Sequence, residues 1–189
     1  MIFGSSKRRL RLEAQTQSWL RSVVRSGLQT SAEIEADLRW VLREDLPYLD
    51  EDLAPRWMEE AYREWAHDAA HWPALTDYDR LQAAFDRLAT QGLPVLVGCE
   101  DHWAATAAIR DLAADAEGLV WFTPMDVWHA VDEPMLEVNV WNRDAVNQRE
   151  GSSLVVRAVM ACGEQGLEAH FDEGRLEIAA RWQRRPDLA

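Results

Sequence analysis

The sequence is poor in cysteine and contains no long apolar run. Its two cysteines, Cys99 and Cys162, lie far apart, which favours two buried thiols in a reducing compartment over a disulfide. No apolar run approaches the ~20 residues that a membrane span needs. The start, MIFGSSKRRLRLEAQ, is basic but lacks the apolar stretch of a secretory signal. We therefore expect a cytoplasmic protein with no membrane association.

Common catalytic and nucleotide-binding motifs are missing as well. The sequence has no Gly-rich phosphate loop, no GxSxG and no CxxC. Nucleotide binding through a common motif, lipase-type catalysis and zinc-ribbon chemistry therefore lack support. We expect no cofactor, with one divalent-metal alternative that is described below.

Positive charge is scarce. Lys7 is the only lysine, and 20 lysines and arginines stand against 33 acidic residues, a net charge of −13. A nucleic-acid binder usually needs a basic face, so we do not expect a nucleic acid as partner. The basic residues gather near both ends, where they form one patch only if the ends meet: Lys7, Arg8, Arg9, Arg11, Arg21 and Arg25, then Arg181, Arg184 and Arg185.

Hydrophobic residues and tryptophan, by contrast, are plentiful. Hydrophobic residues make up 48% of the chain, and ten residues are tryptophan, a side chain that often lies in cores and interfaces. A length of 189 residues suffices for one domain with a core, or for one domain plus a helical extension. An exposed aromatic patch on such a protein would indicate a binding surface.

The first 71 residues have the spacing of helices. Apolar residues recur at helical intervals over about 12–26, 30–46 and 52–71. Gly27 ends the first segment, and Thr30 or Ser31 caps the second with Glu33 close enough to complete a capping box. We expect residues 1–71 to be a helical region that packs on the rest, so that the chain forms one structural unit.

Residues 72–186 alternate between strand and helix patterns. The stretch TDYDRLQAAFDRLATQGLPVLV begins with a cap, contains a buried helical stripe, ends at a glycine and leads into an apolar strand. Later segments predict further strands and helices, with a closing hairpin at Asp172-Glu173-Gly174. The predicted class is α+β, with N-terminal helices followed by a mixed sheet in the order β-α-β-β-α-β-β.

Three stretches resemble an uncharacterised bacterial family, a domain of unknown function. They are TDYDRLQAAFDRLATQGL, GLVWFTPMDVWHAV and LVVRAVMACGEQGLEAHFDEGRLEIAARWQRR, which together cover roughly Trp72 to Arg185. The resemblance implies the fold and brings no activity with it. Members of that family carry a cysteine cluster after the first strand, where this chain reads LVGCEDHWAAT with Cys99 alone. Cys99 and His102 by themselves cannot complete a tetrahedral zinc site.

The segment EEAYREWAHDAAH contains a candidate metal site. On a helix, Glu60, Glu64, His67 and His71 fall on one stripe, because their spacings are four, three and four. The two histidines have the i, i+4 spacing that holds zinc, and mixed imidazole and carboxylate ligands suit zinc, manganese or iron. The simpler interpretation is that these residues form the solvent-exposed face of an amphipathic helix. We favour it because short metal motifs often occur by chance.

The segment CEDHW contains a candidate nucleophile. Cys99 and His102 follow a strand and open a helix, where a thiolate pair would gain from the helix N-terminus. The favoured alternative is a helix cap by Asp101 beside a small buried thiol, because no third orienting group is evident.

Asp126 and His129, in TPMDVWHAV, are a third candidate pair. They lie one helical turn apart, which suits an acid–base couple. If the fold brings this loop beside CEDHW, the two clusters share one cleft.

Two hypotheses for function follow from these patterns. We favour an acidic protein-interaction or regulatory module without catalysis, whose partner is a protein, for example a basic one, or a second copy in a homodimer. The alternative is a metal-dependent hydrolase-type enzyme or a cysteine enzyme that uses one of the clusters above. An enzyme needs a concave pocket of converging polar groups, whereas an interaction module should expose an aromatic or acidic patch.

Overall fold

The structure is a computed structural model that describes residues 3–186, with side chains from residue 6 onward. Its contacts divide the chain into two compact units. The helical unit comprises Met1–Trp72 and Arg184–Ala189, and the α/β unit comprises Pro73–Gln183. One division between the two units falls between Trp72 and Pro73. The prediction that the helical region packs on the rest as one unit stays a prediction.

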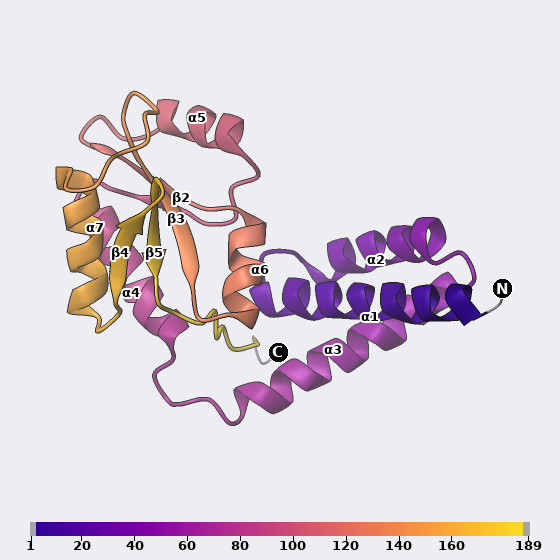
Figure 1. The fold of residues 1–189 in the computed structure, drawn as a ribbon. Coiled ribbons are helices and arrows are strands. Elements are labelled where there is room, and N and C mark those ends of the chain that lie inside the picture. Colours follow the sequence, from indigo (N-terminus) through magenta and orange to yellow (C-terminus); the bar gives the residue numbers. More distant parts are fainter. Residues whose placement is uncertain (1–2, 187–189) are drawn as a thin grey trace. The chain divides into compact units, whose positions relative to one another are not determined.

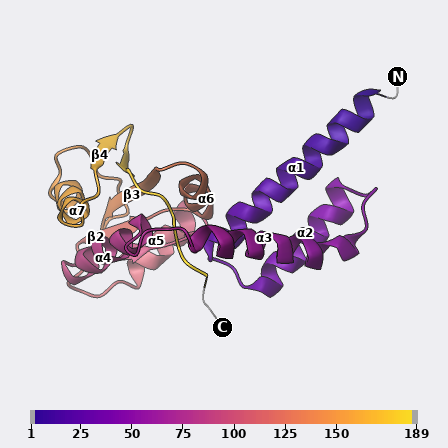
Figure 2. The same cartoon turned by 90° about the horizontal axis from the view of Figure 1, so that it is seen from below.

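The helical unit contains three long helices, α1 (Phe3–Ser26), α2 (Ser31–Asp45) and α3 (Ala54–Ala69), with a short 3-10 turn, η1 (Glu51–Leu53), between the last two (Figures 1 and 2). Each of the three helices contacts the other two. The predicted capping box is confirmed: Thr30 Oγ1 accepts from the backbone N–H of Glu33, and the Glu33 carboxylate accepts from the backbone N–H of Thr30. The buried stripes that join the helices are Leu20, Val23 and Val24, then Ile34, Leu38 and Leu42, then Trp57, Ala61 and Trp65.

Arg184, near the C-terminus, forms hydrogen bonds with two residues of the helical unit. The indole Nε1 of Trp65 donates a hydrogen bond to the carbonyl oxygen of Arg184 at 2.8 Å. The Arg184 guanidinium donates in turn to the carbonyl oxygen of Gly27, just beyond the end of α1. Gly27 has a φ of +62°, and a Cβ there would overlap the Arg184 side chain, so this position requires glycine.

The α/β unit follows the order α4 (Asp77–Thr90), β1 (Val95–Leu96), α5 (His102–Arg110), β2 (Gly118–Trp121), α6 (Pro124–Asp132), β3 (Leu136–Asn142), α7 (Ser153–Glu164), β4 (Ala169–Asp172) and β5 (Arg175–Ile178). The strands form one sheet in the spatial order β1-β2-β3-β5-β4. Only β1 and β2 are parallel. The predicted α+β class, with N-terminal helices and a mixed sheet, is confirmed. The chain order differs from the predicted one by the extra helix α6 between β2 and β3.

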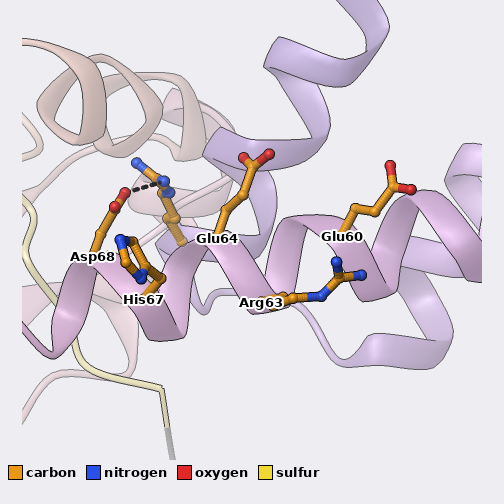
Figure 3. Close-up of a pocket in the computed structure, with 6 residues that line it drawn as sticks. Glu60, Arg63, Glu64, His67 and Asp68 are labelled. Carbon is orange, nitrogen blue, oxygen red and sulfur yellow. Dashed lines mark hydrogen bonds and ion pairs between the residues drawn. The ribbon is translucent and has the colours of Figure 1, made fainter.

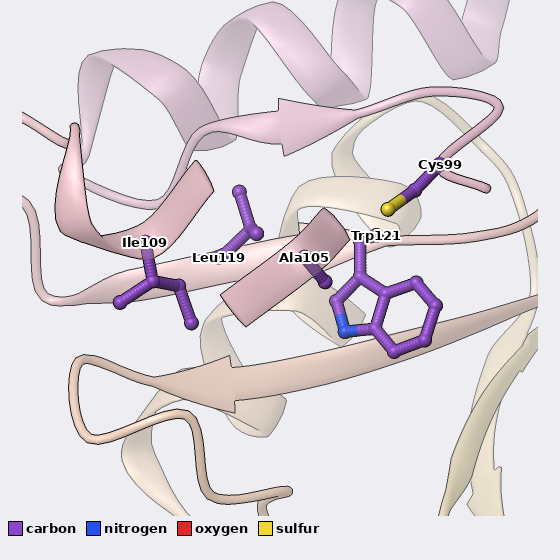
Figure 4. Close-up of a cluster of buried hydrophobic side chains, with 5 residues drawn as sticks. All are labelled: Cys99, Ala105, Ile109, Leu119 and Trp121. Atoms are coloured by element: carbon purple, nitrogen blue, oxygen red, sulfur yellow. The ribbon is translucent and has the colours of Figure 1, made fainter. Parts of the chain in front are cut away.

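The two faces of the sheet differ in what covers them. A Cβ at Gly118 would meet Leu154 of α7, so the Gly118 face of β2 is the one on which α7 packs. Successive strand residues point to opposite faces, which places Leu119 and Trp121 on the other side. There they join Cys99, Ala105 and Ile109 in a buried cluster that seats α5 (Figure 4).

Residues 179–183, which follow β5, have no regular secondary structure but pack against the rest of the α/β unit. Trp182 is nevertheless buried, with edge-on ring contacts to Tyr78 and Phe122 at 4.9 and 6.1 Å between centroids. Its backbone N–H donates to the carbonyl oxygen of Ala130 at 2.8 Å. The segment therefore completes the core of the α/β unit by side-chain packing rather than by strand pairing.

Among the described residues, no helix is both long enough and apolar enough to cross a membrane.

Candidate functional site

The metal candidates lie along the exposed side of α3, in the helical unit. Glu60, Glu64 and His67 line a cavity of about 580 Å³ together with Arg25, Arg63 and Asp68 (Figure 3). Two arginines share this cavity with the carboxylates, and Arg25 forms an ion pair with Asp68 at 2.5 Å. Oε1 of Glu60 lies 3.9 Å from Nε of Arg56. Glu60 therefore has a cationic neighbour, and Glu64 shares its cavity with Arg25 and Arg63.

His71, at the end of the stripe, is engaged locally. Its Nδ1 lies 2.8 Å from the carbonyl oxygen of His67, to which it donates when that nitrogen carries the proton. The centroids of the two imidazole rings are 4.9 Å apart, and the ring planes are tilted by 56° to each other. Within the part of the chain that the structure describes, no group of three or more His, Cys, Asp or Glu side chains has a geometry that holds a metal ion.

Cys99 lies in the buried cluster beneath α5 and is only 4% exposed. Its thiol donates a hydrogen bond to the carbonyl oxygen of Asp101 at 3.2 Å. Burial raises the pKa of the Cys99 thiol, with a smaller opposing effect from that hydrogen bond. A raised pKa disfavours the thiolate, which is the form that attacks substrates.

The other members of CEDHW have structural contacts. The Asp101 carboxylate caps α5 by accepting hydrogen bonds from the backbone N–H groups of Trp103 and Ala104 at 2.9 and 2.8 Å. The His102 ring contacts the Trp103 ring at a tilt of 41°, with centroids 4.5 Å apart. This geometry matches the favoured alternative of a cap beside a buried thiol.

Both thiols are expected to be unreactive in the folded protein. Burial raises the pKa of Cys162 to about 12, and that of Cys99 moves in the same direction. We expect a disulfide reagent to label both thiols at pH 8 at least about 100-fold more slowly than in guanidinium-unfolded protein. Absorbance of the released thiolate measures the rates, and single Cys→Ser variants assign them. Fast labelling of Cys99 in the folded protein would restore the cysteine-enzyme hypothesis.

Asp126 and His129 line a cavity beside α6, here called the α6 cleft. It has a volume of about 380 Å³ and is lined by Thr123, Met125, Asp126, His129, Met135, Glu137 and Arg175. Asp126 belongs to a capping box, in which its Oδ2 accepts from the backbone N–H and hydroxyl of Thr123, both at 2.7 Å. Its Oδ1 accepts from the Arg175 guanidinium at 2.8 Å. Both oxygens of Asp126 are thus occupied.

Arg175 organises the α6 cleft, and sequence reasoning did not single it out. The same nitrogen, Nη1, donates to Asp126 and to Glu137 Oε2, the latter at 2.5 Å. Partial burial lowers the pKa of Arg175, but the hydrogen bonds and charges of the two carboxylates outweigh it and raise the pKa above its ordinary value. The available signal was the antiparallel closing hairpin, which returns Arg175 to the sheet beside β3.

The CEDHW segment and the loop before α6, for which the sequence analysis considered a shared cleft, contact each other through their backbones. The N–H of Cys99 donates to the carbonyl oxygen of Phe122 at 2.8 Å, at the ends of the parallel strands β1 and β2. The lining of the α6 cleft nevertheless contains none of Cys99, Asp101 or His102. The structure thus brings the chain segments together without bringing their side chains into one site.

An exposed aromatic side chain lies at the start of α5. Trp103 is 71% exposed, more than any other tryptophan in the described residues. Glu100 and Asp101 precede it in sequence and are exposed as well. This is the kind of patch that an interaction module should present.

Comparison with known proteins assigns the chain to a sequence family. The family described as a domain of unknown function, DUF6891, matches residues 10–186. No curated protein and no solved structure matches the chain.

Proposed function

The chain belongs to the DUF6891 family of unknown function, and we propose that it is a protein-interaction module that binds a basic partner through its acidic α/β unit. The proposal keeps the cytoplasmic location expected from the sequence. The observation that carries it is the unbalanced charge of this unit. Pro73–Gln183 contains nineteen acidic residues and eight arginines, so this unit accounts for most of the negative charge of the chain.

Several of these arginines donate hydrogen bonds to carbonyl oxygens at the ends of helices. Arg157 donates to the carbonyl oxygen of Gln91 after α4, and Arg80 to that of Gln165 after α7. Arg181 donates to the carbonyl oxygen of Asp132 at the end of α6, and Arg143 to that of Ala113 in the turn after α5. Cations are favourable at helix C-termini because the last carbonyl groups carry partial negative charge.

Among the described residues of the α/β unit, the ion pairs engage Arg87, Arg157, Arg175 and His170, and Arg157 also binds a helix end. The nineteen acidic residues of the unit therefore outnumber the side chains that pair with them. A surface with excess negative charge attracts a positively charged protein and speeds its association.

Trp103 supplies the apolar part of the proposed surface. Interfaces take most of their binding energy from a few residues, and tryptophan is enriched among them. Glu100 and Asp101 precede Trp103 in the chain, are exposed as well and add negative charge to this end of α5. An exposed tryptophan with an acidic rim fits a partner that presents an apolar pocket bordered by lysine or arginine.

Replacing Trp103 with alanine is expected to remove the partner. The full chain, tagged and expressed in the cells of its source organism, should co-purify at 50 mM salt with one basic protein in fixed stoichiometry and release it at 500 mM. For the purified pair, we expect Trp103→Ala to weaken binding by at least about 30-fold, because interface tryptophans often contribute ~2 kcal/mol or more. Isothermal titration calorimetry measures the change.

The matched control is Trp40→Ala, because Trp40 is also exposed, at 56%, but lies on α2 in the helical unit. It should leave the affinity unchanged. Partner binding that resists high salt, or that survives Trp103→Ala, would count against the proposal. If the co-purifying protein is a second copy of this chain, the homodimer expected as an alternative takes its place.

A further inference from the structure

One carboxylate oxygen of the residues that line the α6 cleft has no hydrogen-bond partner among the described residues. Asp126 uses both of its oxygens, on Thr123 and on Arg175. Glu137 uses Oε2 on Arg175, and its Oε1 has no hydrogen-bond partner among the described residues. The Glu137 side chain is 33% exposed, so this oxygen can be reached from the cleft. The free group is therefore a charged acceptor, which suits a donor that carries positive charge.

The charge around Glu137 also favours a cation. Within the cleft, two carboxylates share the single guanidinium of Arg175. In the sheet, Glu137 of β3 lies directly opposite Glu177 of β5. Directly opposite residues of an antiparallel pair point to the same face, where two like charges destabilise the sheet. His170 lies 3.3 Å from Glu177 but is 70% exposed, so it offsets this repulsion only partly.

The walls of the cleft suit a flexible aliphatic chain. Met125 is 71% exposed at the cleft, and Met135 lines it beside Glu137. Methionine is unbranched and polarisable, and it adapts to varied apolar partners. A lysine side chain combines an aliphatic stem with a compact ammonium group. A cavity of about 380 Å³ accommodates one such side chain.

We propose that the α6 cleft binds a lysine side chain of the basic partner, with the ammonium group on Glu137 and the aliphatic stem against Met125 and Met135. The inference rests on the proposed function and assigns it a contact. Lysine is favoured over arginine because only one carboxylate oxygen is free. A guanidinium binds best to two oxygens of one carboxylate at once, whereas an ammonium group needs one strong acceptor.

The test is a methyl NMR titration of the full chain labelled at its methionine methyl groups. The probe is the peptide Gly-Lys-Gly-Lys-Gly. We expect saturable shifts of the Met125 and Met135 signals and none at Met58, which is buried, or at Met160, which is exposed on α7. The same peptide with norleucine in place of lysine keeps the stem and removes the charge, and it should give no shifts.

Glu137→Gln is the decisive variant. A glutamine still accepts a hydrogen bond from Arg175 through its carbonyl oxygen, so the fold is retained, but its amide nitrogen no longer accepts one from an ammonium group. We expect the peptide to bind at least about tenfold more weakly, because hydrogen bonds to charged groups are worth ~1.5–3 kcal/mol. Glu150→Gln, at an exposed loop position, is the matched control and should bind as the parent does.

Unmoved Met125 and Met135 signals would overturn the proposal. Equal shifts at Met160, or undiminished binding by Glu137→Gln, would show adhesion of the peptide to the acidic surface and would overturn it as well. The titration needs no natural partner. Failure here, together with a Trp103-dependent basic partner, would reject the lysine site and leave the proposed function standing.

Discussion

Replacing Gly118 with alanine is expected to destabilise the α/β unit by about 3 kcal/mol or more, since overpacking of a filled core costs this much when the backbone must move. A Cβ at this position would lie 2.1 Å from the carbonyl oxygen of Trp141 on the neighbouring strand β3 and 3.1 Å from a methyl group of Leu154. The first of these atoms belongs to the backbone of a paired strand. It cannot move aside without breaking the register between β2 and β3.

Urea denaturation followed by circular dichroism measures the loss. A suitable control is Gly163→Ala in α7, where a Cβ would meet nothing within 4 Å. That change should stabilise the protein by about 0.5–1 kcal/mol, because alanine is a better helix former than glycine. If Gly118→Ala lowers the free energy of unfolding by less than Gly163→Ala raises it, the close approach of the two strands is not as described.

Asp126→Ala is expected to cost about 2 kcal/mol, the sum of a lost helix cap and a lost partly buried ion pair. The Asp126 side chain is only 10% exposed, and it holds both Thr123 and Arg175. Its removal leaves the Thr123 N–H without its acceptor and Arg175 with Glu137 alone. The same urea denaturation measures this change.

His129→Ala provides the comparison within the sequence-predicted acid–base pair. His129 is exposed, so its removal should change the free energy of unfolding by no more than about 0.5 kcal/mol. A large cost at Asp126 with none at His129 would identify the aspartate as a structural residue of α6. Similar small effects at both positions would return the pair to the list of catalytic candidates.

Local signals in the sequence predicted the secondary structure well wherever nearby residues determine it. Thr30 with Glu33 forms the expected capping box of α2, and Gly27 has the positive φ that a helix end favours. The helix of Leu81, Ala84, Phe85 and Leu88 has its expected buried stripe. Caps, glycines and apolar spacing depend on neighbours three or four residues away, which the sequence displays directly.

The candidate site was predictable only in part. The spacing of Asp126 and His129 was evident in the sequence. Arg175, by contrast, lies 49 residues from Asp126 and 38 residues from Glu137 along the chain. Likewise, the sequence left a Cys99–His102 pair open beside the favoured cap and buried thiol. In the structure the thiol donates to a backbone carbonyl oxygen, and the imidazole contacts Trp103. The direction in which a side chain points depends on packing that spacing does not encode.

The sequence by itself determined the α+β class, the acidity of the chain and the resemblance to a family of unknown function. These properties depend on composition and on short-range patterns, which are written in consecutive residues. Only the tertiary structure decided which charges meet. It directs arginines to the ends of helices, joins Arg175 to two carboxylates and leaves one oxygen of Glu137 without a hydrogen-bond partner among the described residues. Such pairings are set by strand register and helix packing over long sequence distances.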